Sequence, residues 1–104
     1  MQIIKQANYT PDDYERLEVT AAGTTVLTAA KYLKNGRMAA AVLITCENNI
    51  VRWRDDGTPT TGAAGNGSLL LPNASMVIEN RKSIENIKFI AHTGNAILHV
   101  HYYV

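Results

Sequence analysis

The feature that most constrains the fold of this chain is a series of short runs in which apolar and polar residues alternate. In one of these runs, Val51 and Trp53 alternate with Arg52 and Arg54. A period of two places successive side chains on opposite faces of a β-strand, whereas an amphipathic helix needs apolar residues three and four apart. The alternation therefore predicts a protein built from β-strands.

Turn signals divide the chain into about seven or eight short strands. The pairs Asn35-Gly36 and Asp56-Gly57 favour tight turns, because glycine adopts positive φ without steric cost. We expect strands over residues 17–21, 24–28, 38–46, 50–55, 68–71, 75–78, 87–91 and 96–104. Each such strand has one face to bury and needs a facing sheet. The predicted fold class is all-β: an antiparallel β-sandwich, either jelly-roll-like or immunoglobulin-like.

Two pairs of these strands are expected to form hairpins. One joins residues 38–46 to 50–55 across Asn48-Asn49, and the other joins residues 87–92 to 96–104 across Thr93-Gly94-Asn95.

The chain divides into a short leader and one folded domain. Residues 1–16 are predicted to be an N-terminal arm or a single helical turn, since Pro11 followed by two aspartates is typical of a helix start. Residues 17–104 are predicted to be the β-sandwich domain, because a chain of 104 residues suits one core. The glycine-rich loop Gly57–Gly67 has few large side chains, so we expect it to bury little and to be exposed and mobile.

Composition argues against several classes of partner. The formal charge is +1, with acidic and basic residues dispersed, so neither the basic block typical of nucleic-acid binding nor a membrane-spanning apolar stretch is present. The first ten residues lack the apolar core of a secretory signal. Cys46 is the only cysteine, so no internal disulfide can form, and we expect a buried structural thiol.

The three histidines raise the question of a metal site. His99 and His101 share one face of the last strand, and the expected hairpin would bring His92 beside them. Three histidines on adjacent strands can bind zinc or nickel, as a small metal-dependent enzyme of cupin type would require. We favour the alternative, a polar sheet face that holds no metal.

A second candidate region surrounds the only tryptophan. Arg52 and Arg54 share a face and could clamp a carboxylate or phosphate, although salt bridges between subunits are the interpretation we favour. Trp53 faces the other way and is expected in the core. The alternative is that Trp53 and one tyrosine form stacking platforms for sugar rings in a carbohydrate-binding module.

The residues most suited to an interface lie in these two regions. Tyr103 is expected to share a face with His99 and His101, while Tyr102 lies on the opposite face, so one of the two tyrosines should be exposed. The interface candidates are Arg52, Arg54, Asp56, Thr58, His99, His101 and Tyr103.

The sequence contains no recognisable catalytic motif. It has no Gly-Xaa-Ser-Xaa-Gly elbow, no phosphate-binding glycine loop before Lys-Ser or Lys-Thr, and no His-Glu-Xaa-Xaa-His. We therefore expect a protein that is not an enzyme and that uses no cofactor.

Two parts of the chain resemble a known class of protein. Residues 51–60 resemble an Arg-aromatic-Arg, Asp-Gly, Pro-Thr pattern in small proteins encoded among the structural genes of tailed bacteriophages and prophages. Residues 87–90 and 96–103 are similar to their closing hairpin. The resemblance implies a virion structural protein assembled in the host cytoplasm. It would be a capsid decoration or cement protein, or a head–tail component, bound to other virion proteins such as a major capsid protein.

The position of the last residue also favours self-association. Val104 is the last residue and falls inside a strand, so the final hairpin is expected near an uncovered sheet edge. A homo-oligomer, either a trimer or a dimer, would cover it.

Overall fold

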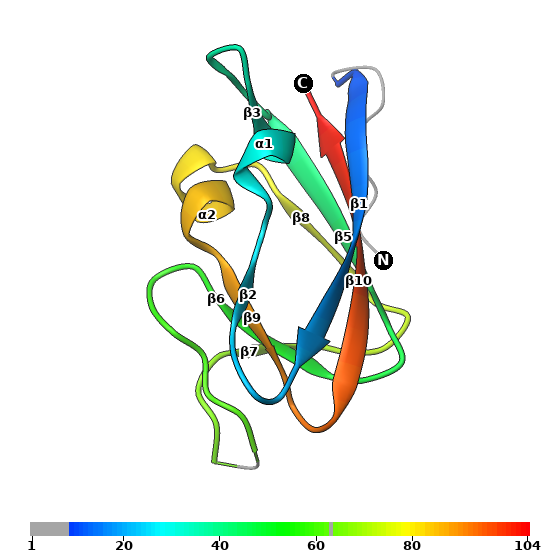
Figure 1. The fold of residues 1–104 in the computed structure, drawn as a ribbon, viewed down its shortest axis with the longest axis vertical. Coiled ribbons are helices and arrows are strands. Elements are labelled where there is room, and N and C mark those ends of the chain that lie inside the picture. Colours follow the sequence, from blue (N-terminus) through cyan, green and yellow to red (C-terminus); the bar gives the residue numbers. More distant parts are fainter. Residues whose placement is uncertain (1–8, 63) are drawn as a thin grey trace.

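The computed structural model describes residues 9–62 and 64–104. Figure 1 shows the arrangement, which is mostly β with antiparallel pairing, as the alternation predicted. The elements are β1 (Pro11–Thr20), β2 (Thr25–Val26), α1 (Ala29–Tyr32), β3 (Leu33–Lys34), β4 (Arg37–Met38), β5 (Ala41–Glu47), β6 (Val51–Arg54), β7 (Ser68–Leu70), β8 (Ser75–Ile78), α2 (Arg81–Asn86), β9 (Lys88–Ala91) and β10 (Asn95–Tyr103).

The strands form two larger sheets and one small ribbon. Sheet A has the order β1-β10-β5-β8, sheet B has the order β2-β9-β6-β7, and β3 pairs with β4. Both predicted hairpins are therefore wrong. Strand β5 belongs to sheet A and β6 to sheet B, and the same is true of β10 and β9. At Asn48-Asn49 and at Thr93-Gly94-Asn95 the chain crosses from one sheet to the other.

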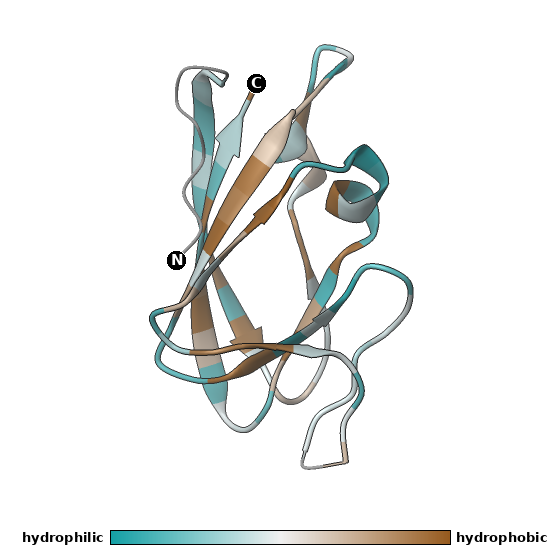
Figure 2. Cartoon of the chain, turned by 180° about the vertical axis from the view of Figure 1, so that it is seen from behind, coloured by the Kyte–Doolittle hydropathy of each residue, from teal (hydrophilic) through white to brown (hydrophobic). Residues whose placement is uncertain are grey.

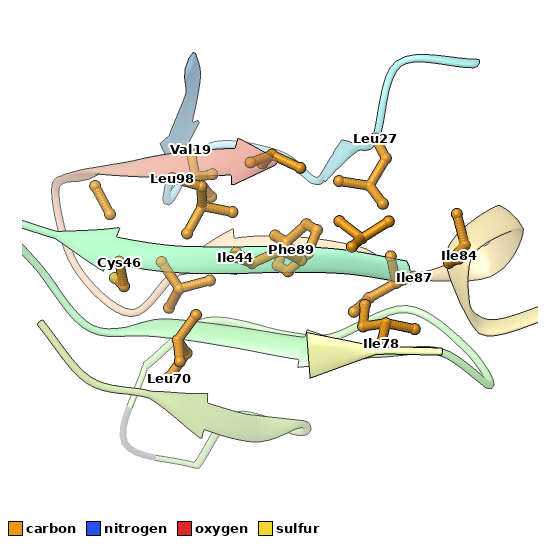
Figure 3. Packing of buried hydrophobic residues seen from close by; sticks show 14 of the residues in the cluster. Val19, Leu27, Ile44, Cys46, Leu70, Ile78, Ile84, Ile87, Phe89 and Leu98 are labelled. Atoms are coloured by element: carbon orange, nitrogen blue, oxygen red, sulfur yellow. The ribbon is translucent and has the colours of Figure 1, made fainter. Parts of the chain in front are cut away.

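The physical reason for these crossings is one core shared by the two sheets. Ile44 and Leu98 of sheet A and Val51 and Phe89 of sheet B are fully buried in the same hydrophobic cluster. Figure 3 shows many of these side chains, and Figure 2 shows that the most hydrophobic segments lie on strands, while hydrophilic ones lie on loops, on α2 and on much of β1. When the chain crosses from one sheet to the other, the apolar faces of both strands are buried in this shared core. A hairpin within one sheet would bury them no better.

Cys46 lies in this core, as predicted, with 1% of its surface exposed. Its thiol donates to the carbonyl of Asn49 at 3.0 Å. Burial raises the pKa of the Cys46 thiol to about 11. The thiol is therefore protonated and shielded at neutral pH.

The prediction of a helical turn at Pro11 is wrong. Residues 11–20 form β1, which pairs with β10 from Pro11 opposite Tyr103 to Thr20 opposite Asn95. Pairing along a whole strand outweighs the local helix signal of one proline and two aspartates. The first eight residues of the predicted arm lie outside the described residues.

The segment between β2 and β5, residues 27–40, leaves the sheets and carries α1, β3 and β4. Helix α1 contributes no buried residue, and β3 pairs only with β4 among the described strands. Asn35-Gly36 forms the predicted tight turn, with φ values of 51° and 78°. Positive φ at both positions is the geometry that favours asparagine and glycine there.

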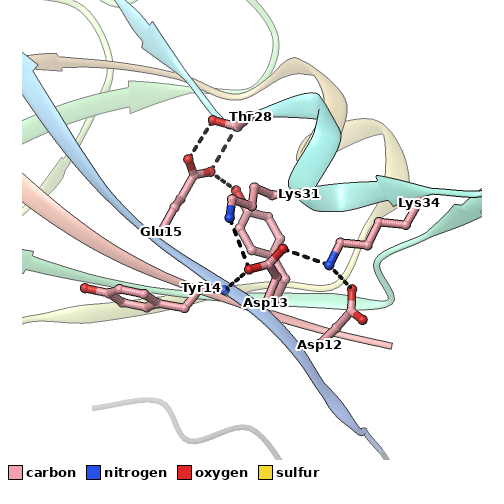
Figure 4. Close-up of polar contacts among 8 residues, drawn as sticks. Asp12, Asp13, Tyr14, Glu15, Thr28, Lys31 and Lys34 are labelled. Carbon is pink, nitrogen blue, oxygen red and sulfur yellow. Dashed lines mark hydrogen bonds and ion pairs between the residues drawn. The ribbon is translucent and has the colours of Figure 1, made fainter.

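A carboxylate of β1 fixes the start of this segment. Glu15 accepts hydrogen bonds from the Thr28 backbone nitrogen at 3.1 Å and from the Thr28 hydroxyl at 2.6 Å. The phenol of Tyr102 also donates to Glu15 (Figure 4). These contacts attach residue 28 to the side of sheet A.

Ion pairs fix the rest of the segment to β1. Asp13 contacts the ammonium of Lys34 at 2.7 Å and that of Lys31 at 3.2 Å (Figure 4). Asp12 contacts Lys34 and Arg37, each at 3.6 Å. These charged contacts add to the burial of Leu27 and Ala39 in the main core, at the two ends of the segment.

Candidate interaction surfaces

The structure does not bring the three histidines together. His99 and His101 project from β10 on the outer face of sheet A, which is the face opposite the shared core. His92 follows β9 of sheet B, and its backbone nitrogen donates to the Ile50 carbonyl at 2.8 Å. The expected convergence depended on the wrong hairpin. Within residues 9–62 and 64–104, no group of three or more His, Cys, Asp or Glu side chains could hold a metal.

His99 is instead the centre of a chain of polar contacts. Its Nδ1 lies 2.7 Å from the Tyr14 hydroxyl, and its Nε2 lies 2.7 Å from Glu47 Oε1. The rings of Tyr14 and His99 are stacked, with their centroids 6.1 Å apart, and the centroid of the His101 ring lies 5.0 Å from that of Tyr14. The Tyr14 hydroxyl can donate or accept in its contact with the ring, whereas the Glu47 carboxylate accepts. Both ring nitrogens are thus engaged, and neither is free to bind a metal.

These polar contacts fix Tyr14 as an oriented aromatic side chain on the surface. A hydroxyl, an imidazole and a carboxylate in this order can activate a nucleophile in hydrolases. Here the three groups lie on an open sheet face, with Tyr14 44% exposed. Sequence reasoning missed Tyr14 and Glu47, because their contact with His99 depends on the register of three strands.

Tyr103 does not join this surface. It is only 7% exposed and packs with Ala41 in a second cluster, to which Tyr9, Leu43 and Val77 add partly buried side chains. Tyr102 is buried in the main core, and burial together with its bond to Glu15 raises the pKa of its phenol. The expectation that one of these tyrosines is exposed is wrong.

The side chain of Arg52 makes hydrogen bonds within the chain. Its guanidinium donates to the carbonyls of Gly62 and Gly67, each at 3.2 Å. The Thr61 hydroxyl donates to the carbonyl of His92 at 2.6 Å, and Pro59 is buried. The expectation that the loop buries little is confirmed for its described residues, of which Pro59 alone is buried, although two of its backbone carbonyls hold an arginine of β6.

The start of the same loop, and the residues just before it, include three more interface candidates: Arg54, Asp56 and Thr58. Arg54 Nε contacts Asp56 Oδ1 at 3.0 Å, and this hydrogen bond lowers the pKa of the Asp56 carboxyl. Thr58 accepts a hydrogen bond from the Lys88 ammonium at 3.3 Å. Trp53 packs against the core cluster, as predicted, and is partly exposed.

An unpredicted apolar surface lies on β7. Leu69 and Leu71 are each 50% exposed, while Leu70 between them is buried. Strand β7 pairs with β6 on one side, and no described strand pairs with its other side. The sequence does carry the signal: successive residues of a strand point to opposite faces, so Leu69 and Leu70 cannot both lie on the buried face of β7.

No known protein family, curated protein or solved structure matches the chain. None of the helices in the described residues has the length and apolar character needed to cross a membrane.

Proposed function

We propose that this chain is a non-enzymatic structural protein that acts through protein–protein contacts and associates with itself through β7. The observation that carries the proposal is an edge of β7 with which no described strand pairs, with two half-exposed leucines beside it. An unpaired strand edge presents backbone donors and acceptors that another strand can use. Exposed apolar side chains next to such an edge add a hydrophobic gain to that pairing.

Two of the three other edge strands, β1 and β2, support this choice by contrast, whereas β8 (Ser75–Ile78) also carries neither a charge nor a proline. Strand β1 carries a proline, several charged residues and a bulge between Pro11 and Asp13, which are the devices that natural sheets use against edge pairing. Strand β2 has only two residues. The sequence Ser68–Leu71 contains neither a charge nor a proline.

Pairing of β7 with its copy about a two-fold axis is self-complementary, so it gives a dimer. Because β7 has only three residues, few backbone bonds can form, and the leucines must supply much of the free energy. Burying the exposed half of a leucine contributes on the order of 1 kcal/mol. We therefore propose a weak, concentration-dependent dimer.

Two further parts of the proposal concern architecture and setting. We propose that sheets A and B act as the two layers of a β-sandwich, a proposal supported by their common core cluster. We also propose a virion setting, as a capsid decoration or cement protein or a head–tail component that binds other virion proteins. This setting is supported by the resemblance of residues 51–60 alone, since the segments compared with a closing hairpin belong to different sheets.

The test is light scattering on the purified chain over a range of concentrations. We expect the wild-type protein to shift from monomer to dimer as concentration rises, and Leu69→Lys to remain monomeric. Leu33→Lys is the matched control, because Leu33 is 45% exposed and lies in the β3–β4 ribbon. A wild-type monomer at the highest concentration, or dissociation caused equally by both variants, would contradict the proposal.

A further inference from the structure

An open hollow lies where β6 ends and β7 begins, beside the only tryptophan of the chain. It is lined by Trp53, Arg54, Asp55, Asp56, Asn66 and Ser68. A second hollow shares Asp55 and Asp56 with it and is also lined by Lys88. Neither the histidines nor the exposed leucines line the hollow, although Ser68 is the first residue of β7.

Part of the lining is held in place by contacts within the chain. Asp55 accepts a hydrogen bond from the Ser83 hydroxyl at 2.8 Å, and Arg54 is paired with Asp56. A side chain at Gly57 would come within 2.9 Å of the Arg54 guanidinium, so glycine lets that group lie against the loop backbone. These polar groups are therefore positioned before any ligand arrives, which reduces the entropy cost of binding.

Other polar groups of the lining have no partner within the described chain. Asn66 uses its backbone nitrogen and carbonyl in bonds to Thr60, at 2.8 Å and 3.1 Å, but its side-chain amide makes no bond to a described residue. The same holds for the Ser68 hydroxyl, and both residues are exposed. The hollow thus offers an amide and a hydroxyl that can each donate and accept.

The charges around the hollows indicate the class of ligand. The carboxylates of Asp55 and Asp56 face the cationic groups of Arg54 and Lys88, so the local charges balance. A phosphate or nucleic acid would need an excess of positive charge, and a divalent cation would need free carboxylates. A neutral ligand with many hydroxyl groups needs what this surface has: planar carboxylate, amide and guanidinium groups that exchange hydrogen bonds, and an indole at the margin.

We propose that this hollow binds a neutral saccharide. Asn66, Ser68 and the outward oxygen of Asp56 would bond to its hydroxyls, and Trp53 would lie at its edge. The inference goes beyond the proposed assembly function, and it is tested on residues outside β7.

The test uses Trp53 as the reporter, since the chain has a single tryptophan. Its fluorescence is followed during titration with three neutral probes, maltotriose, cellotriose and chitotriose, and with sialyllactose as the anionic comparator. Asn66→Ala removes the free amide but keeps the backbone bonds to Thr60, so this variant should fold. Asn95→Ala is the control, because Asn95 is an exposed asparagine on β10 of sheet A.

We expect at least one neutral probe to shift the emission, with affinity reduced roughly fivefold in Asn66→Ala, the effect of losing about one hydrogen bond. Asn95→Ala should bind like the wild type. Three outcomes would overturn the proposal: no response to any neutral probe at millimolar concentration, a response to sialyllactose alone, or equal affinity in Asn66→Ala and the wild type. Light scattering at the titration concentration keeps this result separate from dimer formation.

Discussion

At the scale of single residues, Gly65 is the position where the loop over sheet B tolerates least change. A Cβ atom at Gly65 would lie 2.2 Å from the Thr60 carbonyl and 2.8 Å from Arg52 Nε. We expect Gly65→Ala to lower the free energy of unfolding by roughly 1–3 kcal/mol, the usual cost of forcing atoms into a packed site. Urea denaturation followed by Trp53 fluorescence measures this change.

Gly23→Ala is the matched control for that variant. A Cβ atom at Gly23 would meet nothing within 4 Å, and neither glycine has a positive φ. Replacing glycine where the backbone allows it stabilises a fold by roughly 0.4–1 kcal/mol, through the unfolded state. If the two variants had the same stability, the close packing of the loop around Arg52 would be refuted.

The residue scale also shows where sequence reasoning succeeds and where it fails. The burial of Cys46 and the packing of Trp53 follow from residue type and alternation, which are local properties. The role of Arg52 does not, because its two acceptors lie ten and fifteen residues further along the chain. Composition predicted an exposed loop, which the structure has, but not its hydrogen bonds to Arg52, since backbone carbonyls carry no sequence signal.

At the scale of elements, the α1–β3–β4 segment combines charged contacts with β1 and apolar contacts of Tyr32 and Met38 with the main core. The ammonium of Lys34 and the backbone nitrogen of Tyr14 hold the pKa of the Asp13 carboxyl below its usual value. A carboxyl with a lowered pKa stabilises the folded state above its unfolded pKa of roughly 3.9, and this contribution is lost as the pH falls through the folded pKa. We expect residues 28–38 to lose hydrogen-exchange protection in acid before the sheets do.

Asp13→Asn should reproduce this loss at neutral pH. Exchange corrected for its intrinsic pH dependence should rise in residues 28–38 and stay unchanged in β5 and β10. Glu85→Gln is the control, because it breaks the Arg81–Glu85 pair, 3.6 Å apart on α2, and leaves β1 intact. Equal protection in wild type and Asp13→Asn would show that apolar contacts hold the segment instead.

Strand positions were more predictable from sequence than strand partners. Alternation located most strands, and Asn35-Gly36 located the turn of the small ribbon. Local turn residues at 48–49 and 93–95 cannot distinguish a hairpin from a crossing between sheets, because both need a tight reversal. Helix α2 was missed although Asn80 is a good cap: its side chain accepts from the Ser83 nitrogen at 3.1 Å.

At the scale of the whole molecule, the shared core makes a prediction about cooperativity. Cys46 lies in β5 of sheet A and Trp53 in β6 of sheet B, and both contact the same hydrophobic cluster. If the two sheets fold as one unit, both probes must report one transition, as small single domains usually do. The burial of Cys46 and its pKa of about 11 mean that alkylation must wait for unfolding.

We therefore expect the urea midpoint for Cys46 alkylation to coincide with the midpoint for Trp53 fluorescence. Alkylation without denaturant should be slow, because the reactive thiolate is both scarce and shielded. Cys46→Ser is the control for labelling at other groups, and it should take up no label. Two separate midpoints, or rapid labelling in native buffer, would mean that the sheets open independently, and the proposed two-layer sandwich would then have to be abandoned.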